Sequence, residues 1–458
     1  MLLLLACAGT STPPASPEVP EAAESTEAAE LTAAESAPQP AVTAMPPTPP
    51  PGPRTMGQTI DTTIASEGIG SIAVRLTLPP EPRWADGAGV VVEVGTFFTQ
   101  DDRFYQSIRL EDLGLIHVSY LWPGVSADGQ SSDGEWDHGG ETAIAALRDV
   151  IRFAAGDLTD TQGRDLAAVA GVPVADMPVG MYAFSHPGLA AVTVLSLYGP
   201  QLSRVGWLVT RENPSMEAFS AVELGHFEGD ERVLNPLYNY ERDYQSTDIP
   251  IDYSSARFST ERDAPYFDID GSGDISEGDY VLGKRQPRMF GKRYYSRQLT
   301  AAMAANGIPE GWPEDVATVE EANAVWPFRS NSVQRYASLA QAAPQLHVMI
   351  VFSERQHVQP LPDCPNIHQA WDGFRGAGLW TRINPDASYG AAIVPEVAWT
   401  ERDANAEISS EQWADALSMG HPASVPGAGP RAAKAALAEM ADRTKAGQWA
   451  PDLDAVLP

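Results

Sequence analysis

Apolar residues recur with two different spacings, which alternate from residue 57 to about 400. Short apolar or alternating runs, typical of strands, cover 59–64, 71–78, 89–95, 115–120, 178–184, 204–210, 346–352 and 379–383. Helical spacing covers 141–155, 189–197 and 367–376, and it returns over 410–419 and 431–446. Strands that alternate with helices predict parallel β-α-β units, so we expect an α/β domain with a mostly parallel sheet flanked by helices.

This alternation stops between about 211 and 335 and then resumes. We therefore predict an α/β domain over 57–400 that carries 211–335 as an insertion, and a C-terminal helical tail over 401–458. The first two strands are separated by a glycine-containing turn, which predicts that they form an antiparallel pair.

The insertion contains an acidic twelve-residue loop, 268–279. Oxygen-bearing side chains alternate at Asp268, Asp270 and Ser272, which lets them converge on one hard cation, and Gly273 permits a sharp turn. Further oxygen ligands follow at Asp274, Ser276 and Asp279.

The spacing of these residues resembles the calcium loop of EF-hand proteins, including the dockerin variety. In this resemblance the backbone carbonyl of Asp274 is a ligand, and Asp279 closes the site where Glu is usual. Pro265 before the loop and Gly283 after it disfavour two flanking helices. Since there is one such loop, we predict a structural calcium site and not a sensor. The alternatives are an acidic surface turn, and a dockerin-like part in an extracellular assembly, which the lack of a tandem loop disfavours.

The strand predicted over 178–184 runs directly into Ser185, and helical spacing follows. This order resembles the α/β-hydrolase fold over roughly residues 58–395, in which the nucleophile occupies a tight strand-to-helix turn. The resemblance implies that Ser185 is the nucleophile and that amides at Gly95 and His186 form the oxyanion hole. It also implies that 211–335 is a cap.

The same resemblance implies an acid after strand 346–352 and a histidine after the last strand. Glu354 is the first candidate acid, with Gln356 at an equally plausible position and Asp363 further on. No histidine lies in 383–389, so the candidate bases are His357, His368 and His421.

Other polar and aromatic residues have open interpretations. Asp137 and His138, in a loop rich in Gly, Ser and Asp, would face the same cleft or remain in solvent. The aromatic residues of the insertion would line a pocket or pack in its core. They are Tyr238, Tyr240, Tyr266, Tyr294, Tyr295, Trp312 and Trp326.

The N-terminal 56 residues differ in composition from the rest. Residues 1–7 are apolar and end in Cys7, and Leu4-Leu5-Ala6-Cys7 resembles the lipobox of bacterial lipoproteins, in which the cysteine is lipidated. Residues 8–56 are rich in Pro, Ala, Ser, Thr and Glu, and no Lys or Arg precedes Arg54, which predicts a disordered tether. We expect a lipoprotein of the bacterial cell envelope, periplasmic or on the outer membrane, that meets the membrane only through a lipid at Cys7.

The net charge of −31 argues against nucleic acid and anionic lipid surfaces as partners. Two cysteines exclude a disulfide framework. The hypothesis that best fits these features is a calcium-binding serine hydrolase acting on an ester or peptide-like bond in a small-molecule or peptide substrate. The alternative is a hydrolase-derived binding protein that has a calcium site and no catalysis.

Overall fold

The computed structural model describes residues 57–96, 103–213, 221–228, 231–238, 251–282, 292–308, 310–330, 333–351, 365–385, 389 and 428–449. Cys7, the predicted tether 8–56 and the predicted helix 410–419 lie outside these residues.

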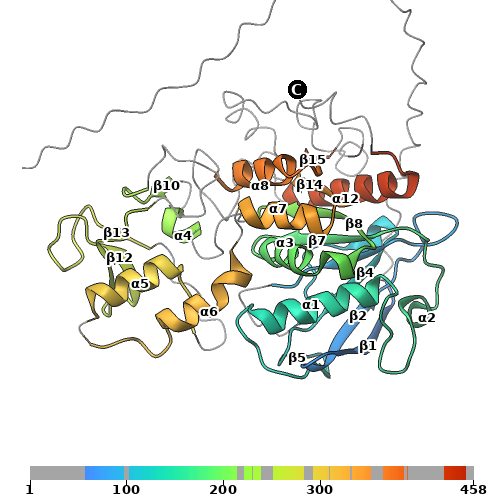
Figure 1. The fold of residues 1–458 in the computed structure, drawn as a ribbon, viewed down its shortest axis with the longest axis horizontal. Coiled ribbons are helices and arrows are strands. Elements are labelled where there is room, and N and C mark those ends of the chain that lie inside the picture. Colours follow the sequence, from blue (N-terminus) through green and yellow to red (C-terminus); the bar gives the residue numbers. More distant parts are fainter. Residues whose placement is uncertain are drawn as a thin grey trace, which may run out of the picture. The chain divides into compact units, whose positions relative to one another are not determined.

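The eight predicted strands form one sheet in the order β1-β2-β4-β3-β7-β8-β14-β15 (Figure 1). Their bounds are Thr59–Ser66 (β1), Gly70–Thr77 (β2), Val90–Glu93 (β3), Ile116–Tyr120 (β4), Val179–Phe184 (β7), Val205–Arg211 (β8), His347–Val351 (β14) and Trp380–Ile383 (β15). β2 pairs antiparallel with β1 and with β4, and every other neighbouring pair in the sheet is parallel. The prediction of a mostly parallel α/β sheet is therefore confirmed.

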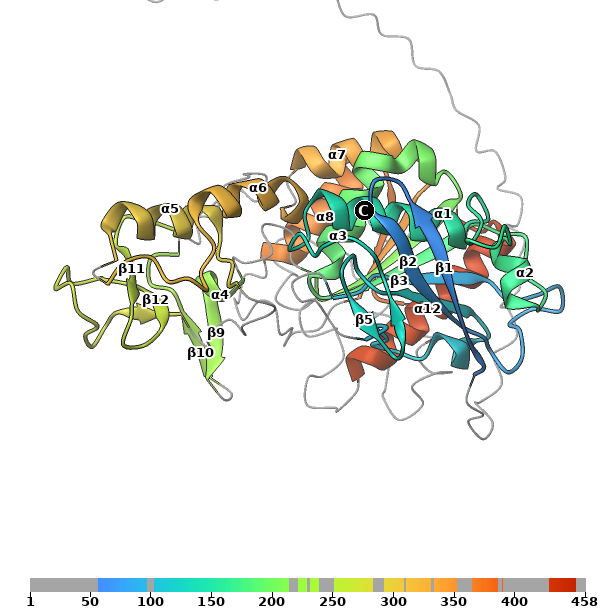
Figure 2. The same cartoon turned by 90° about the horizontal axis from the view of Figure 1, so that it is seen from below.

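Four helices cover one face of the sheet (Figures 1 and 2). They are α1 (Glu141–Ala154), α3 (Pro187–Tyr198), α7 (Val333–Ala342) and α8 (Pro365–Gly376). α3 packs against both α1 and α7. Its sequence is apolar on nearly all sides, as expected for a helix enclosed by a sheet and by other helices.

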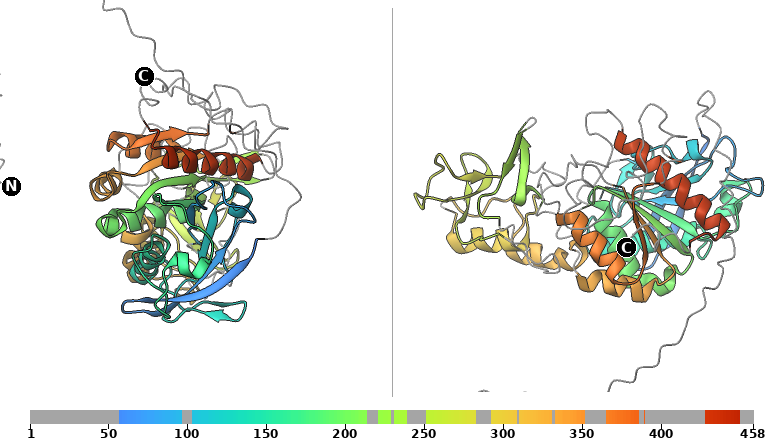
Figure 3. Two further views of the ribbon diagram at one scale, coloured as in Figure 1. Left: turned by 90° about the vertical axis from the view of Figure 1, so that its right-hand side faces the viewer. Right: turned by 90° about the horizontal axis from the view of Figure 1, so that it is seen from above.

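The helix α12 (Ala428–Ala446) lies across the strands on the opposite face (Figure 3). Buried alanines, among them Ala433 and Ala436, let it approach the sheet closely. A fully buried ion pair, Arg382 Nη1 to Glu439 Oε1 at 2.8 Å, fixes it to β15. α12 contains the helix predicted over 431–446, and it completes the α/β core beyond residue 400. None of the described helices has the length and apolarity needed to cross a bilayer.

The remaining elements of the main domain are short. They are β5 (Ser126–Ala127), β6 (Gln130–Ser131), α2 (Leu166–Ala170) and the 3₁₀ turns η1 (Leu110–Leu113) and η2 (Gly199–Leu202).

The insertion follows β8 and has a hydrophobic core of its own. Its elements are α4 (Ala221–Leu224), β9 (Gly225–Glu228), β10 (Glu231–Leu234), β11 (Ala256–Ser259), β12 (Ala264–Phe267), β13 (Tyr280–Val281), α5 (Arg297–Asn306) and α6 (Val319–Arg329). β9 and β10 form one hairpin, and β11, β12 and β13 form a second antiparallel sheet. Tyr238, Tyr295 and other aromatic residues of the insertion pack inside this core.

A fully buried carboxylate joins three segments of the insertion. Glu223 accepts hydrogen bonds from the Ser296 amide (2.8 Å), the Ser296 hydroxyl (2.7 Å) and the Tyr253 hydroxyl (2.7 Å). Burial raises the pKa of Glu223 to about 7 despite these donors. Burial in the folded insertion therefore shifts Glu223 toward its protonated form.

We predict that Glu223→Gln removes part of the pH dependence of stability. The folded pKa lies above the unfolded value, so the contribution of Glu223 is fully present below pH 4.5 and is lost as pH rises through about 7. The loss reaches about 3 kcal/mol at 1.36 kcal/mol per pKa unit. Urea unfolding at pH 5 and pH 8 should show a smaller pH difference for Glu223→Gln than for the wild type. Equal differences in the two proteins would contradict this account.

Candidate functional site

Ser185 occupies the turn between β7 and α3, at the carboxyl end of a parallel strand. Its φ is +65°, a left-handed conformation that costs a non-glycine residue about 1–2 kcal/mol. Its amide donates to the carbonyl of Arg211 on β8 at 2.8 Å, and its carbonyl accepts from the Gly188 amide at 3.0 Å. The turn is thus held on both sides in the strained conformation typical of a nucleophile elbow.

The residues after Ser185 fit this turn. Pro187 stands at the first position of α3, where a fixed φ and a missing amide proton are favourable. Gly188 leaves room for the side chain of Asn213, since a Cβ on Gly188 would lie 2.2 Å from Asn213 Cγ. The Asn213 amide nitrogen donates to the carbonyl of Ser185. Asn213 therefore supports the turn from the end of β8, a role that its sequence context does not indicate.

The hydroxyl of Ser185 lies 3.0 Å from Nδ1 of His186. Both residues are half-buried. If the imidazole proton is on Nε2, Nδ1 accepts a hydrogen bond from the Ser185 hydroxyl. The residue next in the chain therefore contacts the candidate nucleophile directly.

The predicted oxyanion residue Gly95 lies just beyond β3. Its amide donates to the hydroxyl of Tyr120 at 3.3 Å. Tyr120 is buried, and burial raises the pKa of its phenol well above the ordinary value, so it stays neutral. The Gly95 amide would have to leave this hydroxyl to bind an oxyanion.

The predicted acid Glu354 and base His357 lie outside the described residues, as do Gln356, Asp363 and His421. The backbone of His368 lies in α8. The segment that holds Glu354 and His357 begins directly after β14, which pairs with β8, the neighbour of β7. Neighbouring strands lie about 4.8 Å apart, so Val351 at the end of β14 lies at the same sheet edge as Phe184 at the end of β7, roughly 10 Å away.

A buried polar pair lies on the α12 face of the sheet and was not predicted. Glu93 Oε2 on β3 is 3.1 Å from His117 Nε2 on β4, and both side chains are almost fully buried. Glu93 also accepts from the amide of Ser107 at 2.8 Å. The acidic residue in a valine-rich run was the only signal for this pair in the sequence.

Asp137 and His138 have structural contacts. The Asp137 carboxylate accepts from the amides of Gly140 (3.0 Å) and Thr142 (2.6 Å) and so caps α1. The His138 carbonyl accepts from Arg329 Nη1 at 2.6 Å, and its ring centroid lies 4.8 Å from that of Tyr294. Burial, followed by the charge of Arg329, lowers the pKa of His138. These contacts join the loop before α1 to the insertion.

The acidic loop 268–279 joins β12 to β13, in a hairpin whose strands pair Phe267 with Tyr280. The expectation that helices do not flank the loop is confirmed. Tyr266 anchors the loop to β12, because its hydroxyl donates to the Gly273 carbonyl at 2.8 Å.

The carboxylates of Asp268, Asp270 and Asp279 come together in this loop, with one oxygen from each within 4.8 Å of the others. Calcium takes oxygen ligands at 2.3–2.6 Å, so this spacing fits ligands around one ion. Oδ2 of Asp268 accepts from Arg257 Nε at 2.8 Å and from the Gly273 amide at 3.0 Å. Oδ1 of Asp268 is buried and makes no hydrogen bond, which leaves it for a cation.

The other predicted ligands lie in the same loop. The Ser276 hydroxyl donates to Asp270 Oδ2 at 2.9 Å, and the Ser272 hydroxyl donates to the carbonyl of Asp274 at 2.8 Å. Hydrogen bonds from Ser272 lower the pKa of Asp270, so its carboxylate is charged at neutral pH. The six predicted residues therefore lie in one loop, and hydrogen bonds join Ser276 to Asp270 and Ser272 to Asp274.

The sheet order, the helices on both faces and the strand-Ser-helix turn define an α/β-hydrolase-like domain. No protein-family model matches the sequence, and no curated protein matches it. Solved structures of α/β-hydrolase-type peptidases and esterases resemble it in fold.

The acylaminoacyl peptidase of Pyrococcus horikoshii is similar at a TM-score of 0.37 and 9% identity, over 72% of this chain and 36% of that one. Dipeptidyl peptidase 4 of Porphyromonas gingivalis has a TM-score of 0.35 and 10% identity, and the match covers 72% of this chain and 32% of the peptidase. An esterase from the fungus Rhizomucor miehei has a TM-score of 0.33 and 10% sequence identity, and the match covers 72% of this chain and 74% of the esterase. The chain spans about a third of the length of the two peptidases. At these TM-scores the similarities carry no argument about the fold or the activity of this chain.

We predict that the strain at Ser185 is measurable. Ser185→Gly should be more stable than Ser185→Ala by roughly 1 kcal/mol, because glycine adopts a positive φ without a steric penalty. Both substitutions remove the hydroxyl, so urea unfolding compares the backbone effect alone. At Ser196, inside α3, the order should reverse, with glycine less stable by roughly 1 kcal/mol. A glycine variant less stable than alanine at both positions would exclude strain at the turn.

Proposed function

We propose that the chain is a serine hydrolase acting on ester or peptide-like bonds, with Ser185 as the nucleophile. The observation that carries this proposal is the φ of +65° at Ser185, in a turn between a parallel strand and a helix. A left-handed serine at such a turn projects its hydroxyl from the carboxyl edge of the sheet, where α/β hydrolases hold their nucleophile.

The proposed triad takes its base from His357 and its acid from Glu354. Support comes from the strand order, because β7, β8 and β14 are parallel neighbours whose carboxyl ends share one edge. His368 and His421 are the alternative bases, and Asp363 is the alternative acid. The base would accept the Ser185 proton as the hydroxyl attacks the carbonyl carbon, and would return it to the leaving group. The amides of Gly95 and His186 would stabilise the oxyanion.

We further propose that the loop 268–279 binds calcium and stabilises the insertion. The buried, unpartnered Oδ1 of Asp268 beside two further carboxylates supports this proposal. Asp268, Asp270, Ser272, Asp274, Ser276 and Asp279 would hold the ion. Bound calcium would neutralise repulsion among these side chains and lock the hairpin of β12 and β13, and it would take no part in bond cleavage.

The predicted lipidation of Cys7 would attach the protein to the bacterial cell envelope, on the outer membrane or in the periplasm. The 8–56 tether would then separate the α/β domain from the lipid surface. The strong negative charge supports contact through the lipid alone, because anionic headgroups repel an acidic domain.

A second candidate function is ligand binding without catalysis. The hydrogen bond from the Gly95 amide to Tyr120 favours it, since this bond occupies the expected oxyanion donor. In that case the strained turn would be retained for packing around Asn213.

We predict that a fluorophosphonate probe labels Ser185. The Ser185 oxygen would displace fluoride from phosphorus, and peptide mass spectrometry of the full chain would locate the adduct. Ser185→Ala should abolish the label, whereas Ser196→Ala, which removes a hydroxyl from α3, should retain it. Loss of labelling in one variant among His357→Ala, His368→Ala and His421→Ala would identify the base. A folded protein without any label would exclude the hydrolase and support the binding protein.

We predict one calcium site that stabilises the insertion. Calorimetric titration should detect a single ion, and Asp268→Asn should weaken binding about tenfold or more, because it removes a charged ligand. The matched variant Asp252→Asn changes an exposed carboxylate before β11 and should bind as the wild type does. At a hundred times the dissociation constant, calcium should add about 2.7 kcal/mol to the free energy of unfolding of the insertion. Absence of calcium binding would leave the acidic turn as the explanation.

A further inference from the structure

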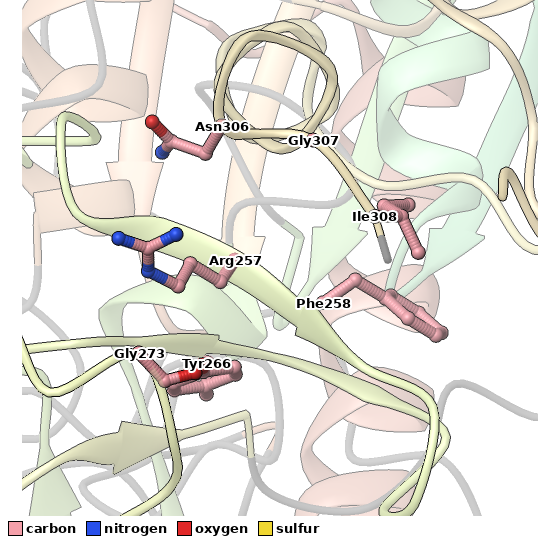
Figure 4. A pocket seen from close by; sticks show the side chains of 7 residues that line it. All are labelled: Arg257, Phe258, Tyr266, Gly273, Asn306, Gly307 and Ile308. Atoms are coloured by element: carbon pink, nitrogen blue, oxygen red, sulfur yellow. Dashed lines mark hydrogen bonds between the residues drawn. The ribbon is translucent and has the colours of Figure 1, made fainter. Parts of the chain in front are cut away.

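A cavity of about 250 Å³ opens in the insertion between β11, β12 and the end of α5 (Figure 4). This volume is below that of pockets for drug-sized molecules, so it suits a small ligand. The side chains that line it are those of Arg257, Phe258, Tyr266, Asn306 and Ile308, together with Gly273 and Gly307.

Arg257 supplies the charged group of this cavity. Its Nε donates to Asp268 Oδ2 at 2.8 Å, and about a third of its side chain is exposed. In Figure 4 its two terminal nitrogens point toward the side of Asn306. Within the described part of the chain those nitrogens make no hydrogen bond. A guanidinium with one edge held and the other open presents a fork that matches a carboxylate.

The other walls of the cavity are mostly apolar or already hydrogen-bonded. Phe258 and Tyr266 are nearly fully buried, and Ile308 is half-buried opposite them. The Asn306 amide nitrogen donates to the carbonyls of Ser254 (3.0 Å) and Ala256 (2.7 Å). The lining therefore offers one cation and a short apolar surface.

We propose that this cavity binds a small monocarboxylate with an apolar body. The carboxylate pairs with the open edge of Arg257, and the apolar part lies against Phe258 and Ile308. A dianion such as phosphate is disfavoured, because the lining holds a single cation and the acidic loop lies directly beside it.

Asp268 connects this cavity to the proposed calcium site. One carboxylate oxygen of Asp268 holds Arg257, and the other, Oδ1, is buried among the calcium ligands. Without the ion, the carboxylates of the loop repel an anion at Arg257. With the ion, two positive charges offset them, so calcium strengthens carboxylate binding and the carboxylate strengthens calcium binding equally. This coupling rests on the calcium site proposed above. Carboxylate binding in the cavity does not require that site.

The test is calorimetric titration of the full chain with hydrocinnamate, in calcium and in chelator. We expect binding that is about five to ten times tighter with calcium. The neutral analogue hydrocinnamide should bind about tenfold or more weakly than hydrocinnamate. Arg257→Gln should bind hydrocinnamate about tenfold or more weakly than the wild type does. Arg262 is an exposed arginine on the same hairpin, and the control Arg262→Gln should bind hydrocinnamate with unchanged affinity. Ile308→Phe, which fills the cavity and leaves the Arg257–Asp268 pair in place, should also abolish binding.

The outcomes separate the two parts of this inference. No hydrocinnamate binding to calcium-loaded protein, or equal binding by wild type and Arg257→Gln, would overturn the carboxylate site. Equal affinities in calcium and in chelator would overturn the coupling alone. If calcium itself does not bind, the calcium site fails together with the coupling, while dependence of hydrocinnamate binding on Arg257 would still support the cavity as a ligand site.

Discussion

The hydrogen bond from the Ser185 amide to the Arg211 carbonyl ties the elbow to the neighbouring strand. A serine at a positive φ keeps that conformation only if its surroundings enforce it. Here the enforcement comes from the parallel pairing of β7 with β8, from the start of α3 at Pro187 and from the Asn213 side chain beside Gly188. The large sheet supplies the rigidity, and the chemistry proposed for Ser185 depends on it.

Buried polar groups connect segments of the insertion that are far apart in the chain. Its small hydrophobic core surrounds Glu223, and its outer hairpin carries the acidic loop. A core of this size buries limited apolar surface. The raised pKa of Glu223 makes the stability of the insertion sensitive to pH.

Local patterns in the sequence predicted the strands well, because runs such as Val90-Val91-Val92 have few alternatives to a buried strand. They also located the Ser185 turn and the acidic loop 268–279, whose residues are close together in the chain. Contacts between segments that are far apart in the chain could not be predicted from these local patterns. The Glu93–His117 pair depends on β3 lying beside β4, and the Gly95–Tyr120 bond depends on the same pairing. Helical periodicity identified the helix α12. It does not indicate which surface a helix packs against, so the sequence did not predict that α12 packs on the sheet.

The position of α12 makes assembly of the α/β core a late event in the life of the chain. Asp442 pairs with Arg83 at 2.6 Å across 359 residues of sequence, and α12 shields apolar side chains such as Trp207 and Met349. During synthesis the side chains that α12 shields stay without this helix until α12 itself has left the ribosome. The contacts between α12 and the sheet therefore form only after segments as distant as Arg83 and Asp442 have both been synthesised.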